Sequence, residues 1–72
     1  MNNDAHRFID IWSNIRDGLK QLRASRKFAQ ENYDLLSIEG QQSEQGRRAK
    51  DGINEVDRVI AHLKKVIKET EP

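Results

Sequence analysis

Hydrophobic residues recur at alternating spacings of three and four along both halves of the chain. The row in the first half is Phe8, Trp12, Ile15, Leu19, Leu22, Arg26, Ala29, Tyr33 and Leu36. The row in the second half is Gly46, Ala49, Ile53, Val56, Ile60, Leu63, Ile67 and Thr70. This spacing is the heptad pattern of helices that pack along one stripe, whereas a strand would alternate every second residue. The pattern predicts two long helices, at about residues 4–38 and 43–70.

The segment between the two rows predicts a turn at about residues 39–42. Gly40 is a typical C-terminal stop for the first helix. Ser43 followed by Glu44 is a suitable N-cap and first turn for the second helix. A short connection makes two long helices antiparallel neighbours. We therefore predict an all-α fold in which residues 1–72 form a single helical-hairpin domain of coiled-coil type.

The hairpin can be aligned by pairing the two hydrophobic rows across a turn centred near Gln41. The predicted pairs are Tyr33 with Ala49, Ala29 with Ile53, Arg26 with Val56, Leu22 with Ile60, Leu19 with Leu63, Ile15 with Ile67, and Trp12 with Thr70. This register puts Arg26 beside Glu55 and Asp57, and a charged residue with partners in such a seam is a known way to specify register. A break near residues 25–27 would instead give three helices, but the heptad pattern continues across that point.

The two sides of the predicted seam differ in charge. One side, which we call the uncharged flank, consists of Ile11, Gly18, Ser25, Phe28, Leu35, Gly52, Val59 and Val66. An isolated hairpin would be expected to carry charge on both sides, for solubility. Gly18 and Gly52 each cost about 1 kcal/mol relative to Ala inside a helix, which is understandable where another backbone approaches closely. We expect this flank to dock a second helical surface, completing a four-helix bundle with a second copy or with a partner protein.

A second candidate contact site lies at the N-terminal end, where the second helix has run out. Phe8, Ile9 and Trp12 form an apolar patch there. Exposed aromatic side chains that gather in one place are typical of binding surfaces.

The opposite side of the seam, the basic flank, offers a different interpretation. It carries Arg16, Lys20, Arg23, Lys27, Lys64 and Lys68, although the net charge of the whole chain is only +1. Such a stripe suits contacts with phosphates, although it lacks aromatic residues for base stacking. A nucleic-acid-binding regulator is therefore the alternative function.

The amino-acid composition limits which cofactors, metals and reactions the chain could support. The chain has no Cys and two His, which is too few ligands for a structural zinc site, and no catalytic, phosphate-binding or metal-binding motif is present. We expect no cofactor, no metal and no small-molecule substrate, and hence a protein that is not an enzyme. A membrane surface is the least favoured partner, since Asp10 and Asp17 lie on the polar face of the first helix. The polar N-terminus lacks the hydrophobic region of a signal peptide, so a cytoplasmic protein is expected.

Taken together, these patterns predict a small protein-protein interaction module, either a homodimer or an adaptor-like subunit. In size and outline the predicted hairpin is similar to the co-chaperones of type III secretion needles. It is also similar to the small hairpin regulators of plasmid copy number, which dimerise into four-helix bundles. The likeness is one of architecture and implies no role for individual residues.

Overall fold

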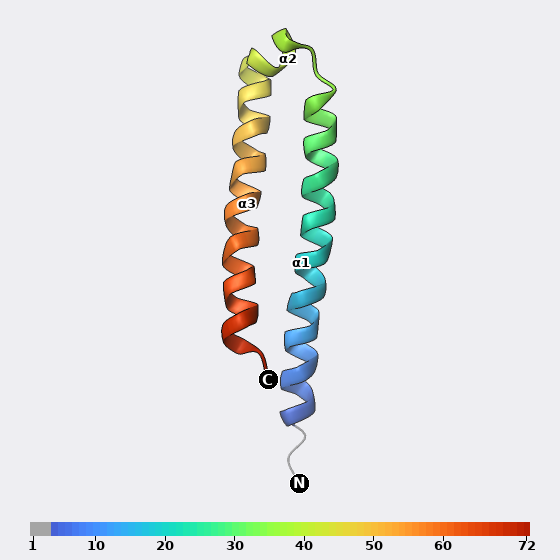
Figure 1. The fold of residues 1–72 in the computed structure, drawn as a ribbon, viewed down its shortest axis with the longest axis vertical. Coiled ribbons are helices and arrows are strands. Elements are labelled where there is room, and N and C mark those ends of the chain that lie inside the picture. Colours follow the sequence, from blue (N-terminus) through green and yellow to red (C-terminus); the bar gives the residue numbers. More distant parts are fainter. Residues whose placement is uncertain (1–3) are drawn as a thin grey trace.

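The computed structural model describes residues 4–72 and contains three helices in this part of the chain. They are α1 (Asp4–Asp34), α2 (Ile38–Gln42) and α3 (Glu44–Thr70). The two long helices, α1 and α3, run antiparallel, and α2 crosses between them at the turn end (Figure 1). The predicted all-α class and the packing of one long helix against another are confirmed. The molecule is a rod of 62 × 16 × 14 Å.

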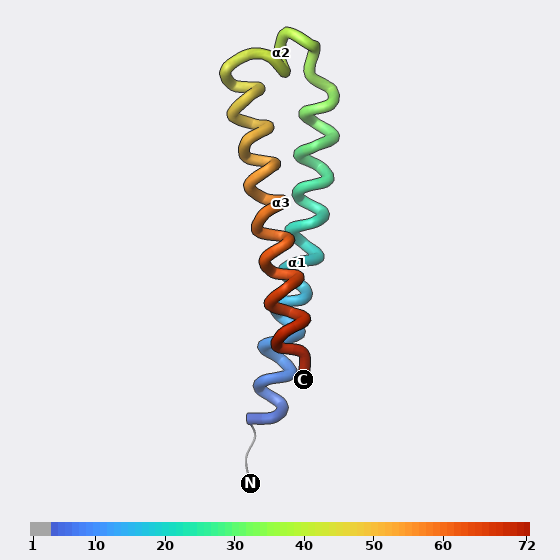
Figure 2. Tube along the Cα trace, turned by 60° about the vertical axis from the view of Figure 1, so that its left-hand side comes forward, coloured from blue at the N-terminus to red at the C-terminus, as the bar shows by residue number. Residues whose placement is uncertain are grey.

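The seam between α1 and α3 is narrow and buries few side chains completely. Leu19 and Ile53 are the buried hydrophobic side chains of the described chain, each 5% exposed. Most other members of the two rows are half-buried: Trp12, Ile15, Leu22, Arg26, Tyr33, Val56, Ile60, Leu63 and Ile67. A view from another side shows that α1 and α3 stay adjacent and that the N-terminal end of α1 projects past the end of α3 (Figure 2).

Contacts across the seam agree with the predicted register. Arg26 Nε donates to Asp57 Oδ1 at 2.8 Å and Arg26 Nη2 donates to Asp57 Oδ2 at 3.1 Å. Near the turn, the Lys50 ammonium lies 5.5 Å from the centre of the Tyr33 ring. The alternative with a break near residues 25–27 is wrong, because α1 continues without interruption through that segment.

The first long helix ends earlier than the predicted residue 38. The hydrogen bond from Leu36 N to Tyr33 O closes a tighter turn after Asp34, and the backbone of Ser37 is then extended. Ser37 Oγ accepts from Gly40 N at 3.0 Å, so this hydroxyl caps a new short helix, α2, within the predicted turn. The side chain of Gln41 donates to Tyr33 O and to Leu36 O, at 3.4 and 3.3 Å. Tyr33 O also accepts from Leu36 N, so the bond from Gln41 adds to it, and the bond to Leu36 O gives a partner to a carbonyl just beyond the end of α1.

The two glycines near the turn have different roles from those predicted. Gly40 does not stop the first helix, because it lies inside α2 and no glycine of residues 4–72 has a positive φ. The close approach occurs at Gly46, where a Cβ would lie 2.1 Å from Gly40 O and 2.6 Å from Gln41 O. Ser43 caps α3 as predicted, since its Oγ accepts from Gly46 N at 3.0 Å. The same hydroxyl donates to Gly40 O at 2.6 Å and so ties α2 to the start of α3.

Candidate functional site

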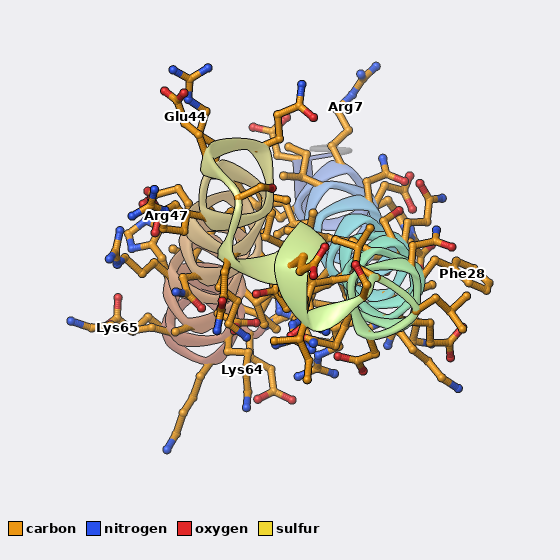
Figure 3. The ribbon with its side chains drawn as sticks, turned by 90° about the horizontal axis from the view of Figure 1, so that it is seen from above. Arg7, Phe28, Glu44, Arg47, Lys64 and Lys65 are labelled. Carbon is orange, nitrogen blue, oxygen red and sulfur yellow. The ribbon has the colours of Figure 1, made fainter. Side chains whose placement is uncertain are left out.

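The uncharged flank presents large apolar side chains to water. Phe28 is 62% exposed, Leu35 is 83% exposed and Val59 is 43% exposed, and Ile11 is exposed as well. Phe28 points outward from α1, on the side away from α3 (Figure 3). Val66 is half-buried beside the seam. The hairpin by itself therefore leaves most of the apolar surface of this flank uncovered.

An open hollow lies on this flank near the turn end. Its volume is about 370 Å³, and its walls are Leu22, Ser25, Arg26, Ala29, Ala49, Gly52, Ile53 and Val56. A second hollow of about 270 Å³ shares three of these walls and continues toward the turn, with Asn32, Tyr33 and Leu36 as further walls. Ala29 and Ala49 were predicted as seam residues, yet both are exposed. Their short side chains do not reach across the gap between the helices, so the seam is open here.

The two glycines of the uncharged flank have no role within the single chain. A Cβ at Gly18 or at Gly52 would meet nothing within 4 Å. Each glycine costs about 1 kcal/mol relative to Ala inside a helix. At position 46, in contrast, only Gly fits, because a Cβ there would overlap the backbone of α2. Nothing inside the hairpin compensates for the cost at Gly18 and Gly52.

The predicted N-terminal patch divides into two parts. Phe8, which is 63% exposed, and Ile9 both lie open to solvent. Trp12 is half-buried, and its indole Nε1 donates to the carbonyl oxygen of Ile67 at 3.0 Å, in the last turn of α3. Trp12 therefore belongs to the hairpin seam as much as to the patch. A hollow of about 380 Å³ connects the two parts, lined by Phe8, Ile11, Trp12, Ile15 and Thr70.

The apolar surface extends further at the turn than the sequence pattern predicts. Leu36 and Ile38 are exposed beside Leu35, and Ile38 is 73% exposed. Leu36 was predicted as a seam residue, but it follows the end of α1 and is 42% exposed. The signal available in the sequence was the run Leu35-Leu36-Ser37-Ile38, in which three of four residues are apolar next to a turn.

The basic flank is solvent-exposed along its whole length. All six of its predicted residues, Arg16, Lys20, Arg23, Lys27, Lys64 and Lys68, are exposed. The Arg16 guanidinium lies 4.9 Å from the centre of the Trp12 ring. Lys64 extends outward from α3 into solvent (Figure 3).

The ion pair between Arg26 and Asp57 in the seam shifts the pKa values of both side chains. The hydrogen bond from Arg26 lowers the pKa of the Asp57 carboxyl below its ordinary value, and partial desolvation opposes this effect. The same bond raises the pKa of Arg26. The pair therefore favours the charged form of both groups and ties α1 to α3 at one height.

Residues 4–72 contain neither a candidate metal site nor a membrane-spanning helix. No three His, Cys, Asp or Glu side chains in this range are grouped so as to hold a metal ion. No helix of the described chain combines the length and the apolar character needed to cross a bilayer. No model of a known protein family matches the chain, and comparisons with curated proteins and with solved structures give no match either.

Proposed function

We propose that the chain is a protein-interaction module without catalytic activity, which docks a helical protein surface on its uncharged flank. The observation that carries this proposal is the separation of exposed side chains. Phe28, Leu35 and Val59 are open to water on one flank, whereas six exposed Lys and Arg side chains lie on the other. A contiguous exposed apolar surface bounded by polar residues is typical of protein-protein contact sites.

The small core of the hairpin supports the same proposal. A chain of this length buries little apolar surface and has marginal stability unless a staple or a partner adds to it. Within the described residues, the buried hydrophobic side chains are Leu19 and Ile53. A second pair of helices over the flank would bury Val59 and Val66 and close the hollow at Gly52. The product would be a four-helix bundle.

The shape of the hollows favours a helix as the occupant. They form an open trough along the seam, with walls made mostly of apolar and small side chains. Small-molecule sites are usually enclosed and hold several convergent polar groups. A long apolar trough is instead suited to a helix that lays its apolar face into it.

Photo-crosslinking in cells that produce the chain tests this function. A photoreactive amino acid at Phe28 or at Val59 should give discrete crosslinked protein bands. The control positions are Asn54 and Ala61 of α3, which are exposed and lie outside the flank. Crosslinking from Ala61 that equals crosslinking from Phe28 would contradict the proposal, and so would the absence of bands from Phe28.

A matched pair of double variants adds a second readout. Val59→Glu with Val66→Glu should abolish the bands from Phe28, because two carboxylates would be buried against the partner. Asn54→Glu with Ala61→Glu makes the same change in charge at the same spacing along α3, and it should leave the bands unchanged. If both variants have the same effect, the interface does not lie on the uncharged flank.

Nucleic-acid binding is the second candidate function, favoured by the six exposed cations of the basic flank. Binding of a labelled duplex should then weaken steeply, on the order of a thousandfold, between low and moderate salt, because each phosphate contact releases counterions. Lys20→Glu with Lys27→Glu should remove the binding, whereas Val59→Glu with Val66→Glu should leave it. Binding that is insensitive to salt would exclude this candidate.

A further inference from the structure

We infer that the occupant of the uncharged flank is a second copy of this chain, packed antiparallel about a two-fold axis that crosses α3 at Val59. The inference rests on the proposed function, and it specifies the partner, the orientation and the register. In this arrangement the turns of the two hairpins lie at opposite ends, with α1 against the copy's α1 and α3 against the copy's α3.

The exposed area of the chain is the first argument. The chain exposes 5983 Å². A compact monomer of 8.4 kDa would expose about 4,600 Å², so the excess is roughly 1,400 Å². If each copy buries this excess, the interface totals about 2,800 Å², which lies in the range of obligate homodimers. The uncovered surface is therefore of the size that one further copy would cover.

The second argument comes from α1, which has another heptad-spaced row beside the seam. This row contains no charged residue: Ile11, Asn14, Gly18, Gln21, Ser25, Phe28, Asn32 and Leu35. In the dimer, the α1 rows of the two copies run in opposite directions, and the two-fold axis is level with Arg23. This places Phe28 against the copy's Gly18 and Ile11 against the copy's Leu35. The amide side chains of Asn14 and Asn32 also face each other. Each exposed apolar side chain thus meets either an apolar side chain or a glycine.

This pairing explains the open space at Gly18. A Cβ there would meet nothing within 4 Å in the hairpin, and Phe28 is an exposed ring on the same helix. In the dimer, the ring of the copy's Phe28 occupies that space, and the absence of a side chain at Gly18 lets the two backbones approach.

The register of the hairpin also determines which residues of α3 meet the copy's α3. Arg26 lies level with Val56 and Asp57, so an axis at Arg23 of α1 passes α3 at the height of Val59 and Ile60, of which Val59 is on the uncharged flank. Val59 then meets the copy's Val59, and Gly52 meets the copy's Val66. Gly52 is one wall of the hollow near the turn, and Val66 supplies an apolar side chain that enters it.

Charged residues at the edge of the same face select this register. The outer row of α3 consists of Arg48, Glu55, His62 and Glu69. The proposed axis brings Arg48 within one residue of the position opposite the copy's Glu69, and Glu55 within one residue of the position opposite the copy's His62. A shift of the rows by one heptad would instead place Glu55 opposite either Glu55 or Glu69 of the copy. Like charges at an interface are unfavourable, so the proposed register is preferred over its neighbours.

The outer row of α3 also determines the relative orientation of the two hairpins. If the turns of both hairpins lay at one end, α1 of one copy would pack on α3 of the other. Phe28 and the rest of the uncharged row would then lie against a face of α3 on which Gly52, Val59 and Val66 alternate with the charged row, which consists of Arg48, Glu55, His62 and Glu69. Burying charges against an apolar row is costly, which favours the antiparallel arrangement.

Disulfide formation between engineered cysteines tests the register, since the natural chain has no Cys. Val59→Cys should form an intermolecular disulfide with itself, because Val59 lies on the axis. Gly52→Cys and Val66→Cys should each fail alone, but an equimolar mixture of the two, refolded together, should form the disulfide. Oxidation of Val59→Cys should be at least roughly tenfold faster than that of Ala61→Cys, because a dimer raises the effective thiol concentration.

The outcomes separate this inference from the proposed function. A dimeric mass by light scattering together with the Val59→Cys disulfide supports the inference. Circular dichroism confirms that each variant is helical, and the mixed Gly52→Cys and Val66→Cys pair provides the test if Val59→Cys does not fold. A dimer in which Val59→Cys oxidises no faster than Ala61→Cys overturns the register. A monomeric mass at all concentrations overturns the inference, and the in-cell crosslinks from Phe28 then decide separately whether the flank binds another protein.

Discussion

Replacing Gly46 with Ala should destabilise the hairpin, although Ala is the better helix former. A Cβ at this position would lie 2.1 Å from Gly40 O, whereas ordinary contact begins at 3.4 Å. The obstacle is backbone, which cannot rotate away as a side chain can. Either α2 or the first turn of α3 must move by more than an ångström, and this would break the bond from Ser43 Oγ to Gly40 O.

The size of the effect follows from two opposing contributions. Overpacking against backbone costs about 3 kcal/mol, at the upper end of the usual range. The better helix propensity of Ala returns at most about 1 kcal/mol. The net loss for Gly46→Ala is about 2 kcal/mol, which lowers Tm by roughly 8–16 °C in a domain of this length. This is a substantial fraction of a total stability of about 4–11 kcal/mol.

Thermal unfolding followed by far-ultraviolet circular dichroism, at one protein concentration, measures this loss. Gly40→Ala is the matched control, since it lies in the same turn and its Cβ would meet Ser37 Oγ at 3.3 Å, a contact with a side chain. Its Tm should change little, because a slight movement of the hydroxyl offsets the gain in helix propensity. Equal Tm values for the two variants would show that α2 does not pack on Gly46 as described.

Two further predictions concern the contacts between α1 and α3. Trp12→Phe keeps an aromatic ring but removes the donor to Ile67 O. It should lower the free energy of unfolding by about 1 kcal/mol and increase amide hydrogen exchange in the last turn of α3. Unchanged exchange there would contradict the role of this bond. Asp57 has a lowered pKa in the folded state, so its contribution to stability is present above the ordinary pKa of the carboxyl and is lost as the pH falls through the lowered value. Denaturation as a function of pH should show this loss in the wild type, and Asp57→Asn should remove that part of the pH dependence; an identical pH profile for both proteins would show that the pair with Arg26 contributes nothing.

The structure also indicates how folding and binding are linked in this chain. Leu19 is buried in the seam, whereas Ala29 and Ala49 lie exposed in the open trough near the turn, which Ile53 also lines. Because the trough lies on the uncharged flank, the partner that covers the flank also completes the core of the hairpin. Stability and association are therefore expected to rise together with protein concentration if the partner is a second copy.

The residue pattern alone determined the two long helices, their antiparallel packing and the contact between Arg26 and Asp57. These features depend on spacing and residue type, since a heptad row specifies which face of a helix is apolar, and a short connection leaves one way to bring two such faces together. The cap at Ser43 was predictable for the same reason, because capping is a local property of a hydroxyl next to a helix start.

Tertiary structure decided the features that depend on distances across the chain. Helix α1 ends at Asp34 because Ser37 caps α2 and Gln41 reaches back to Tyr33 O and to Leu36 O, an outcome that a periodic pattern cannot encode. Gly46 is required by the oxygen of Gly40, which reaches it only after the chain has turned. The trough lies where the short side chains of Ala29 and Ala49 face the seam, and only the tertiary arrangement shows that the hollow beside them stays open.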